Sequence, residues 1–169
     1  MPDTSLGFTY PASGAHTRIW EHFQELASDI NAGMVARTPL LSTAQVSSAT
    51  TLTTTMSDMP GGSVTLTTTL PNTKAMVIWS PDFQCMTAST AVPYSVVAVD
   101  GVDQPQNAVF TPGGTAGAGA RCSPSNAFFV NLATAGAHVF KIRAAVSSTN
   151  GSWRVNNSTS SITALALPW

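Results

Sequence analysis

Hydrophobic residues follow two different spacings along the chain. Near the start they step by 3 and 4 residues, which places them on one face of a helix, and this seam contains His16, Ile19, Phe23, Leu26 and Ile30. Trp20 widens the seam, and the acidic residues of the segment stay off it. From Ser42 onward the spacing is two, which is typical of strands. We therefore expect one amphipathic helix followed by a β domain.

The predicted helix starts after Pro11 with Ser13 as its cap, and Gly33 and Pro39 bracket its end. A helix of this length is marginal alone in water, so its apolar face needs a cover. That cover is either the β domain of the same chain or a partner helix or groove in an assembly. We favour the second alternative, and we expect the seam residues and Trp20 to form an anchoring or trimerising surface.

The β domain begins with a repeated Thr-rich pattern. Thr51–Met56 recurs as Thr65–Leu70 with Met59–Gly62 between them, so we expect an antiparallel pair. Further strands are expected at Ala75–Trp79, which is apolar enough for a central strand, at Tyr94–Val99 before an Asp-Gly turn, and at Ala127–Leu132.

The C-terminal part gives the clearest strand pattern. Phe140, Ile142, Ala144 and Val146 alternate with Lys141 and Arg143, and Asn150-Gly151 then turns the chain into another strand with Trp153 and Val155. The last strand has apolar residues on both sides, so we expect one side to face the core and the other a neighbouring subunit. The residues assigned to this intersubunit strand are Ile162, Leu165, Leu167 and Trp169.

The many short strands and turns predict a mainly β protein, an antiparallel β-sandwich of the jelly-roll kind with a single N-terminal helix. We expect a leader and anchoring helix at residues 1–39 and the sandwich at residues 40–169. The β domain also loosely resembles the trimeric heads of the tumour-necrosis-factor and C1q type, through its Gly-Ala-His-Val-Phe-Lys-Ile run at residues 136–142 and its apolar last strand.

Charge is sparse and unevenly placed. Charged residues make up 9% of the 169 residues, well below the usual quarter, which favours a subunit of an assembly. All acidic residues lie before Gln104, and beyond it the basic residues are Arg121, Lys141, Arg143 and Arg154. These either face an acidic partner or, as we favour, pair within the sheet with Asp82, Asp100 or Asp103. They are too scattered to predict nucleic-acid binding.

No pattern of catalytic or metal-binding residues emerges, so we expect neither an enzyme nor a cofactor. The histidines lack metal-ligand spacing, and only chance spacing would make Asp82 with Asp100 or Asp103 a glycosidase pair. Cys85 and Cys122 are expected to be reduced thiols, with a disulfide left open. The sequence Met1-Pro2-Asp3 does not resemble a signal peptide, and no apolar run is long enough to span a membrane, so synthesis in a host cytoplasm is expected.

The leader carries the most specific resemblance. Gly-Phe-Thr-Tyr-Pro at residues 7–11, with Phe8, Tyr10 and Pro11, precedes His-Thr-Arg-Ile-Trp-Glu-His-Phe-Gln-Glu-Leu-Ala at residues 16–27. Together these segments resemble the N-termini of small virion proteins of tailed bacteriophages, especially phages of actinobacteria, which are usually called minor tail or appendage proteins. The resemblance implies that leader and helix fasten a variable β domain to the particle, with other virion proteins as partners. The helix seam and the last strand, which is apolar on both sides, predict a homotrimer. Two alternatives are a capsid decoration protein and a host-glycan-binding head.

Overall fold

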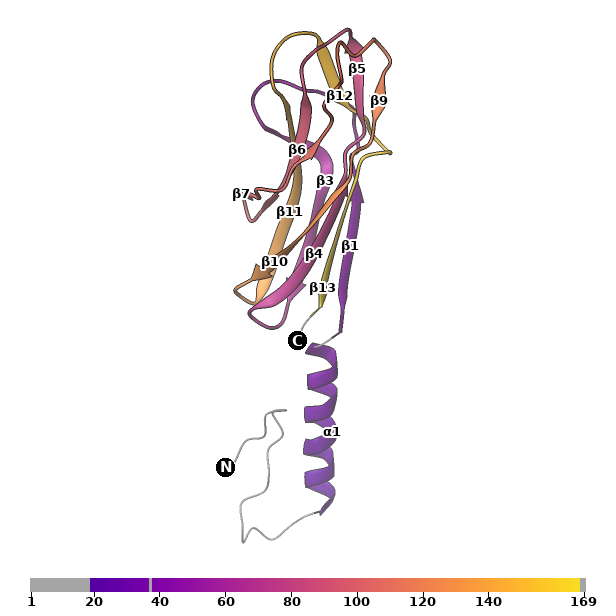
Figure 1. Ribbon diagram of the computed structural model, residues 1–169. Coiled ribbons are helices and arrows are strands. Elements are labelled where there is room, and N and C mark those ends of the chain that lie inside the picture. The colour runs from indigo at the N-terminus through magenta and orange to yellow at the C-terminus, as the bar shows by residue number, and fades with distance from the viewer. Residues whose placement is uncertain (1–18, 37, 168–169) are drawn as a thin grey trace.

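The computed structural model describes residues 19–36 and 38–167. Figure 1 shows an elongated molecule in which one helix stands at the end of a β-sandwich. The helix lies outside the two layers of the sandwich, and the end of the last strand lies close to the point where the helix meets the first strand. The chain therefore enters and leaves the sandwich at the same end.

The helix, α1, spans Ile19–Ala36. Its end falls between Gly33 and Pro39, as the sequence predicts. The amide of Thr38 donates to the carbonyl of Val35 at 3.2 Å, and the Thr38 hydroxyl donates to the carbonyl of Met34 at 3.1 Å. These bonds satisfy carbonyls of the last turn, and Pro39 then disfavours further helix. The predicted start at Pro11 and Ser13 lies outside the described residues.

All strand pairs are antiparallel, and they form three sheets. The first sheet has the order β1 (Leu40–Gln45), β13 (Ser161–Leu167), β4 (Thr73–Ser80), β10 (Asn126–Leu132). The second has the order β3 (Ser57–Thr68), β11 (Gly136–Val146), β6 (Pro93–Val99), β7 (Val102–Asp103), and β8 (Ala108–Val109) also pairs with β6. The third has the order β2 (Thr50–Thr51), β12 (Ser152–Val155), β5 (Phe83–Thr87), β9 (Arg121–Cys122).

The third sheet continues the first one strand for strand. β1 leads into β2, β4 into β5, β9 into β10 and β12 into β13, and both sheets keep the same lateral order. The two therefore form one long layer with a break across all of its strands, which we call the broken layer. It faces the layer of β3, β11, β6, β7 and β8, which we call the continuous layer. With each interrupted strand counted once, the connectivity is that of a jelly roll, as predicted.

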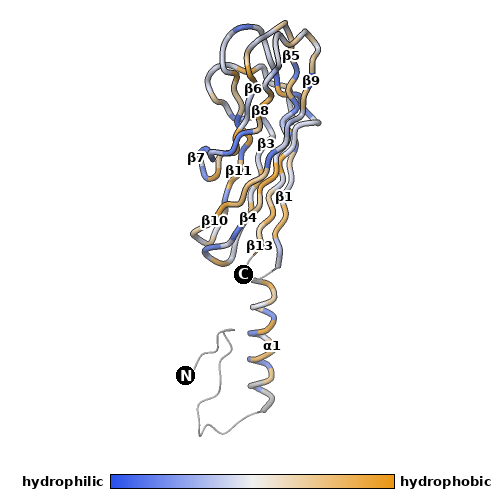
Figure 2. Tube along the Cα trace, viewed as in Figure 1, coloured by the Kyte–Doolittle hydropathy of each residue, from blue (hydrophilic) through white to orange (hydrophobic). Residues whose placement is uncertain are grey.

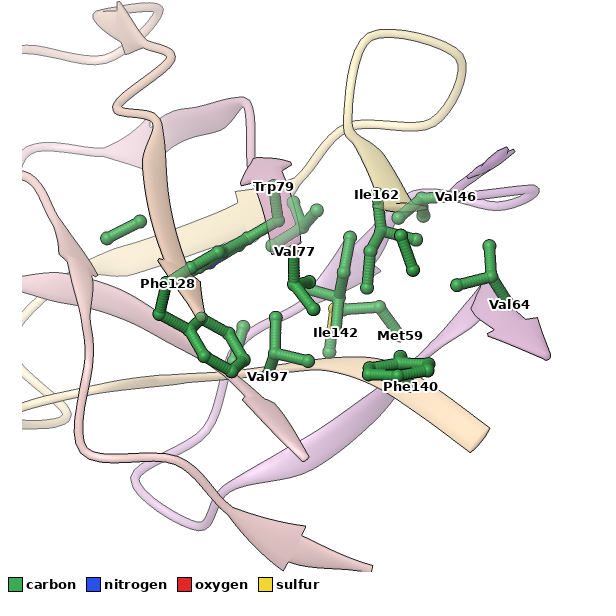
Figure 3. Packing of buried hydrophobic residues seen from close by; sticks show 14 of the residues in the cluster. Val46, Met59, Val64, Val77, Trp79, Val97, Phe128, Phe140, Ile142 and Ile162 are labelled. Carbon is green, nitrogen blue, oxygen red and sulfur yellow. The ribbon is translucent and has the colours of Figure 1, made fainter. Parts of the chain in front are cut away.

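The core lies between the two layers. Trp79, Val77 and Ile162 from the broken layer meet Phe140 and Ile142 from the continuous layer, and all of these side chains are fully buried (Figure 3). Trp79 also packs edge-on against Phe128, and its indole nitrogen donates to the hydroxyl of Ser95 at 2.9 Å. Alternation of inward apolar residues with outward residues therefore fixes the face of each strand.

Most of the predicted strands are confirmed. Ala75–Trp79 lies in β4, between β13 and β10, and Tyr94–Val99 ends at a turn where Asp100 and Gly101 both have positive φ. Ala127–Leu132 forms nearly all of β10, and the alternating pattern around Lys141 and Arg143 forms β11.

The predicted Thr-rich hairpin is wrong. Met59–Gly62 is part of the long strand β3, which pairs with β11, whereas Thr51 pairs with Arg154 of β12. Pro60 is tolerated because β3 is an edge strand, and Gly61 adopts a φ of 75° where a Cβ would meet Ser47. The register of β11 shifts between Lys141 and Arg143 opposite this point, so a bulge replaces the expected turn.

Candidate assembly surface

The described part of α1 has an apolar stripe that the sandwich does not cover. Phe23, Leu26 and Ile30 are exposed, Phe23 by 61%, and Met34 continues the line toward the end of the helix. These are residues of the predicted seam, apart from Met34, which follows one turn later. The β domain therefore does not cover Phe23, Leu26 or Ile30, and for these residues the first of the two alternatives for the helix is wrong.

A second apolar surface lies on the outside of the broken layer. Leu41 pairs with Leu165, Leu165 with Met76, and Met76 with Phe129. Since directly paired residues point to the same face of a sheet, these side chains form one row across the four strands. We call it the outer row. Leu41 is 68% exposed and Phe129 is 74% exposed.

Neighbouring positions extend the outer row on both sides. The next row, away from the helix, joins Thr43, Thr163, Ile78 and Ala127, and the row nearer the helix joins Leu167, Lys74 and Asn131. Lys74 is the one charged residue in β1, β13, β4 and β10. In Figure 2 hydrophobic colours are frequent along β1, β13 and β10. The outside of the sheet formed by β1, β13, β4 and β10 is therefore largely apolar and nearly uncharged.

The predicted intersubunit strand is partly right about orientation. Leu165 and Leu167 point outward, as expected, and Ala164 and Ala166 point into the core. Ile162 must be corrected: it has the same parity as Ala164 and is fully buried, so its side chain is part of the core and is not offered to a neighbour. Trp169 lies outside the described residues.

Other predicted positions are described incompletely or not at all. Phe8, Tyr10, Pro11 and His16 lie outside the described residues, and for Ile19 and Trp20 only the helical backbone is described. Sequence reasoning missed Leu41, Met76 and Phe129 as surface residues. The signal was present for Met76, because it alternates with Ala75 and Val77, but a short apolar run gives no sign of which alternate residues face outward.

The outside of the continuous layer is built differently, because its charges pair with one another. Lys141 bonds Asp58 at 3.0 Å, and Arg143 contacts the same carboxylate at 3.0 Å and Asp103 at 2.7 Å. Arg143 also donates to the carbonyl of Met56 at 3.2 Å. The favoured alternative for the basic residues, pairing within the sheet, is therefore confirmed for Lys141 and Arg143. Their partner Asp58 was not among the acidic residues expected from the sequence.

The other two basic residues lie in the broken layer, beyond the break. Arg154 donates to the side-chain carbonyl of Gln84 on the neighbouring strand, at 2.7 Å and 3.1 Å. Arg121 forms a two-point ion pair with Asp82. Its partner, Asp82, lies at the break itself, directly after Pro81.

Asp82 ties the strands together where the layer breaks. Asp82 is only 1% exposed, and its carboxylate accepts hydrogen bonds from Arg121 and from the Thr159 hydroxyl. Its amide donates to the Ser160 hydroxyl oxygen at 2.8 Å, and its carbonyl accepts from the amide of Asn156 at 2.8 Å. Burial acts to raise the pKa of Asp82, but bonds from Arg121 and Thr159 and the charge of Arg121 outweigh it, so that the pKa is lowered.

A second polar contact joins β11 to the turn that follows β6 in the continuous layer. Nδ1 of His138, which is 6% exposed, lies 2.7 Å from the Asp100 carboxylate, and Nε2 donates to the carbonyl of Thr134 at 3.0 Å. Both ring nitrogens face acceptors, so the doubly protonated ring fits best. The bond to Asp100 raises the pKa of His138, burial opposes it, and the Thr134 carbonyl adds to the increase. Asp82 and Asp100 thus serve separate contacts in different layers.

The two cysteines lie on neighbouring strands of the broken layer, β5 and β9. Cys85 and Cys122 are free thiols whose pKa values are raised by burial. Cys122 lies opposite Phe83, which makes Cys85 a diagonal neighbour about 7–8 Å away, too far for a disulfide. Among the described residues no group of His, Cys, Asp or Glu side chains could hold a metal ion, and no helix is long and apolar enough to cross a membrane.

Comparisons with known proteins give only distant likenesses. No protein-family model matches the sequence, and no curated protein matches it. The VP2 subviral particle of infectious bursal disease virus resembles the chain with 10% identity and a TM-score of 0.49, over 77% of this chain and 33% of that one. The Gx strain of the same virus gives 11% identity, 77% and 32% coverage, and a TM-score of 0.47.

A bacterial protein resembles the chain about equally well. Dimeric latent PorU from Porphyromonas gingivalis gives 10% identity, 77% and 13% coverage, and a TM-score of 0.43. The chain spans about a third or less of the length of all three of these proteins. With TM-scores below 0.5, these likenesses carry no argument about what the chain does.

Proposed function

We propose that the chain is a structural protein of a bacteriophage particle, fastened by its N-terminal helix and displaying its sandwich outward. In the most specific form of the proposal it is a homotrimeric tail appendage. The observation that carries the proposal is the apolar stripe of α1, which is exposed on a helix standing clear of its own sandwich. A helix that exposes Phe23 and Leu26 in the isolated chain gains most of its stability from a partner.

Two further features support this proposal. The leader and helix resemble the N-termini of phage virion proteins, and the sparse charge of the chain suits a subunit whose surface is partly covered by neighbours. The sandwich contributes a rigid body that can be displayed, because its layers are joined by a continuous core. The mechanism is assembly and contact, and it requires no chemical step.

Nothing described favours a host-glycan-binding head over this role. Sugar binding would be favoured by aromatic side chains exposed on loops. Among the described side chains the exposed aromatic residues are Phe23, on α1, and Phe129, on β10. Both belong to the apolar surfaces that we assign to assembly.

Electron microscopy of labelled particles tests the proposal. An epitope inserted beside Thr149, in the exposed turn between β11 and β12 at the end remote from α1, is detected with gold-labelled antibody on purified virions. Label on the tail is the expected result. Label on the head would replace the tail appendage with a decoration protein, and purified particles without label would reject a virion role. The same epitope in a Phe23→Ala, Leu26→Ala chain should give unlabelled particles.

A further inference from the structure

We infer that the outer row of the broken layer is a contact between copies of this chain, and that it forms one continuous interface with the stripe of α1. The inference rests on the proposed function for the role of the helix and goes beyond it by assigning the sandwich face, its residues and its occupant. The row consists of Leu41, Leu165, Met76 and Phe129, one residue from each strand of the sheet.

The face is apolar over more than a single residue. Ile78 and Leu167 in the adjacent rows are also exposed, by 41% and 40%. From strand spacing and rise, three rows across four strands cover about 400 Å². That is about half of the roughly 800 Å² per partner that a standard interface buries. The sheet face alone is therefore too small for a stable contact, and it needs a neighbouring surface that binds the same partner.

The helix provides that neighbouring surface. β1 starts four residues after α1 ends, and its exposed Leu41 follows the exposed Met34 and Val35 of the last helical turn. Exposed apolar residues thus occur on the last turn of α1, at the start of β1 and along the outer row, and in the row between helix and outer row the charged residue is Lys74. A partner seated on the helix stripe near its end is in position to reach the outer row as well.

Charge selects a second copy as this partner. When copies related by rotation bring the same face to a common axis, charges of the same sign on that face approach one another and repel. The charged residues of the continuous layer would be brought together in this way. The outer row and the row beyond it contain no charge, and Lys74 is the charged residue of the row nearer the helix. An uncharged face is compatible with itself, and closed rotational symmetry buries it in every copy at once.

The test compares paired lysine substitutions on the two outer faces of the full chain. Leu41→Lys with Phe129→Lys charges the outer row, and Thr65→Lys with Thr67→Lys charges exposed positions on β3 of the opposite face. Multi-angle light scattering over a dilution series gives the mass, relative to the 17.5 kDa chain, and the concentration at half-dissociation. Circular dichroism confirms folding, and Leu41→Ser with Phe129→Ser serves as a milder pair if the lysine pair misfolds.

The parent chain should associate, and the outer-row variants should dissociate at concentrations at least tenfold higher, whereas the β3 variant should match the parent. Equal dissociation of the outer-row and β3 variants would overturn the inference. A monomeric parent chain would also overturn it, and would show that another part of the chain or a different protein covers the face. A monomer that still labels virions would leave the proposed function standing, so the two failures are distinguishable.

Discussion

The two outer faces of the sandwich use the same alternating strand pattern for opposite purposes. On the continuous layer the outward residues of β11 are Lys141 and Arg143, which bond Asp58 and Asp103 within the chain. On the sheet of β1, β13, β4 and β10 the outward residues include Leu165 and Met76, which are partly exposed, and Phe129, which is 74% exposed. One face pairs its own charged side chains, and for the other we propose that a partner covers its apolar side chains.

The difference predicts which substitutions affect association and which affect folding. Residues of the exposed apolar surfaces should change the association constant with little effect on the free energy of unfolding of one chain. Residues of the internal polar contacts should do the reverse.

The largest effect is expected on α1. Phe23→Ala or Leu26→Ala should each cost about 2–5 kcal/mol of association, the range for losing a buried large side chain, because the seam becomes buried only in the assembly. Ser28→Ala, off the seam on the same helix, should cost less than about 0.5 kcal/mol. Dilution monitored by light scattering measures both. Equal losses from Ser28→Ala and Phe23→Ala would show that the helix binds through another face.

Next in size is the buried carboxylate at the break of the layer. Asp82→Asn should reduce the free energy of unfolding by about 1–3 kcal/mol, since the charged hydrogen bonds to Arg121 and Thr159 are weakened, and should leave association unchanged. The lowered pKa of Asp82 means that its contribution is present above the unfolded pKa of about 3.9 and is lost as pH falls through the folded pKa. Urea unfolding at pH 7 and at pH 3 should show a smaller acid loss in the variant, and an equal acid loss would contradict this account.

A smaller effect is expected from His138. Its pKa is raised, so the stabilisation is fully present below the unfolded pKa of about 6.5 and is lost as pH rises through the folded pKa. Stability should therefore fall by about 1 kcal/mol between pH 6 and pH 9 as the charged hydrogen bond weakens. Thermal unfolding of Asp100→Asn should lack most of this decrease. A parent chain that is more stable at pH 9 would contradict the assignment.

The smallest effect is expected on the outside of the continuous layer. Lys141→Gln removes a half-exposed ion pair with Asp58 and should lower the free energy of unfolding by less than about 1 kcal/mol. The effect should shrink further in 1 M salt, which screens exposed charges, whereas association through the apolar face should persist there. If Lys141→Gln lost association, the interface would lie on the continuous layer, and our assignment of it to the broken layer would be wrong.

The sequence predicts the elements better than it predicts their partners. The helix, the central strand Ala75–Trp79 and the strands around Lys141 and Trp153 follow from spacing and turn residues. The path through Met59–Gly62 does not, because a bulge on an edge strand uses the same Pro and Gly residues as a turn.

The candidate surface was only half predictable for a related reason. Leu165 and Leu167 stand out because the last strand is apolar on both sides, whereas Leu41 and Phe129 join them only through the register of four strands that are distant in sequence. The parity of Ile162 depends on the same register. The sequence analysis includes Asp82 among the expected partners of Arg121, and the pair is confirmed. The position of this pair at a break in the layer follows only from the fold.

The position of β1 has a mechanical consequence. β1 is the edge strand that follows α1, and it is held to β13 by a ladder from Leu40 opposite Ala166 to Gln45 opposite Ser161. If the helix is fixed and the far end of the sandwich is pulled, tension acts along β1 and across its hydrogen bonds. The bonds of the ladder are then stretched in parallel as a group, and not opened one after another as in a zipper. β1 therefore connects the sandwich to its anchoring helix and, through its ladder with β13, also resists a force that pulls the two apart.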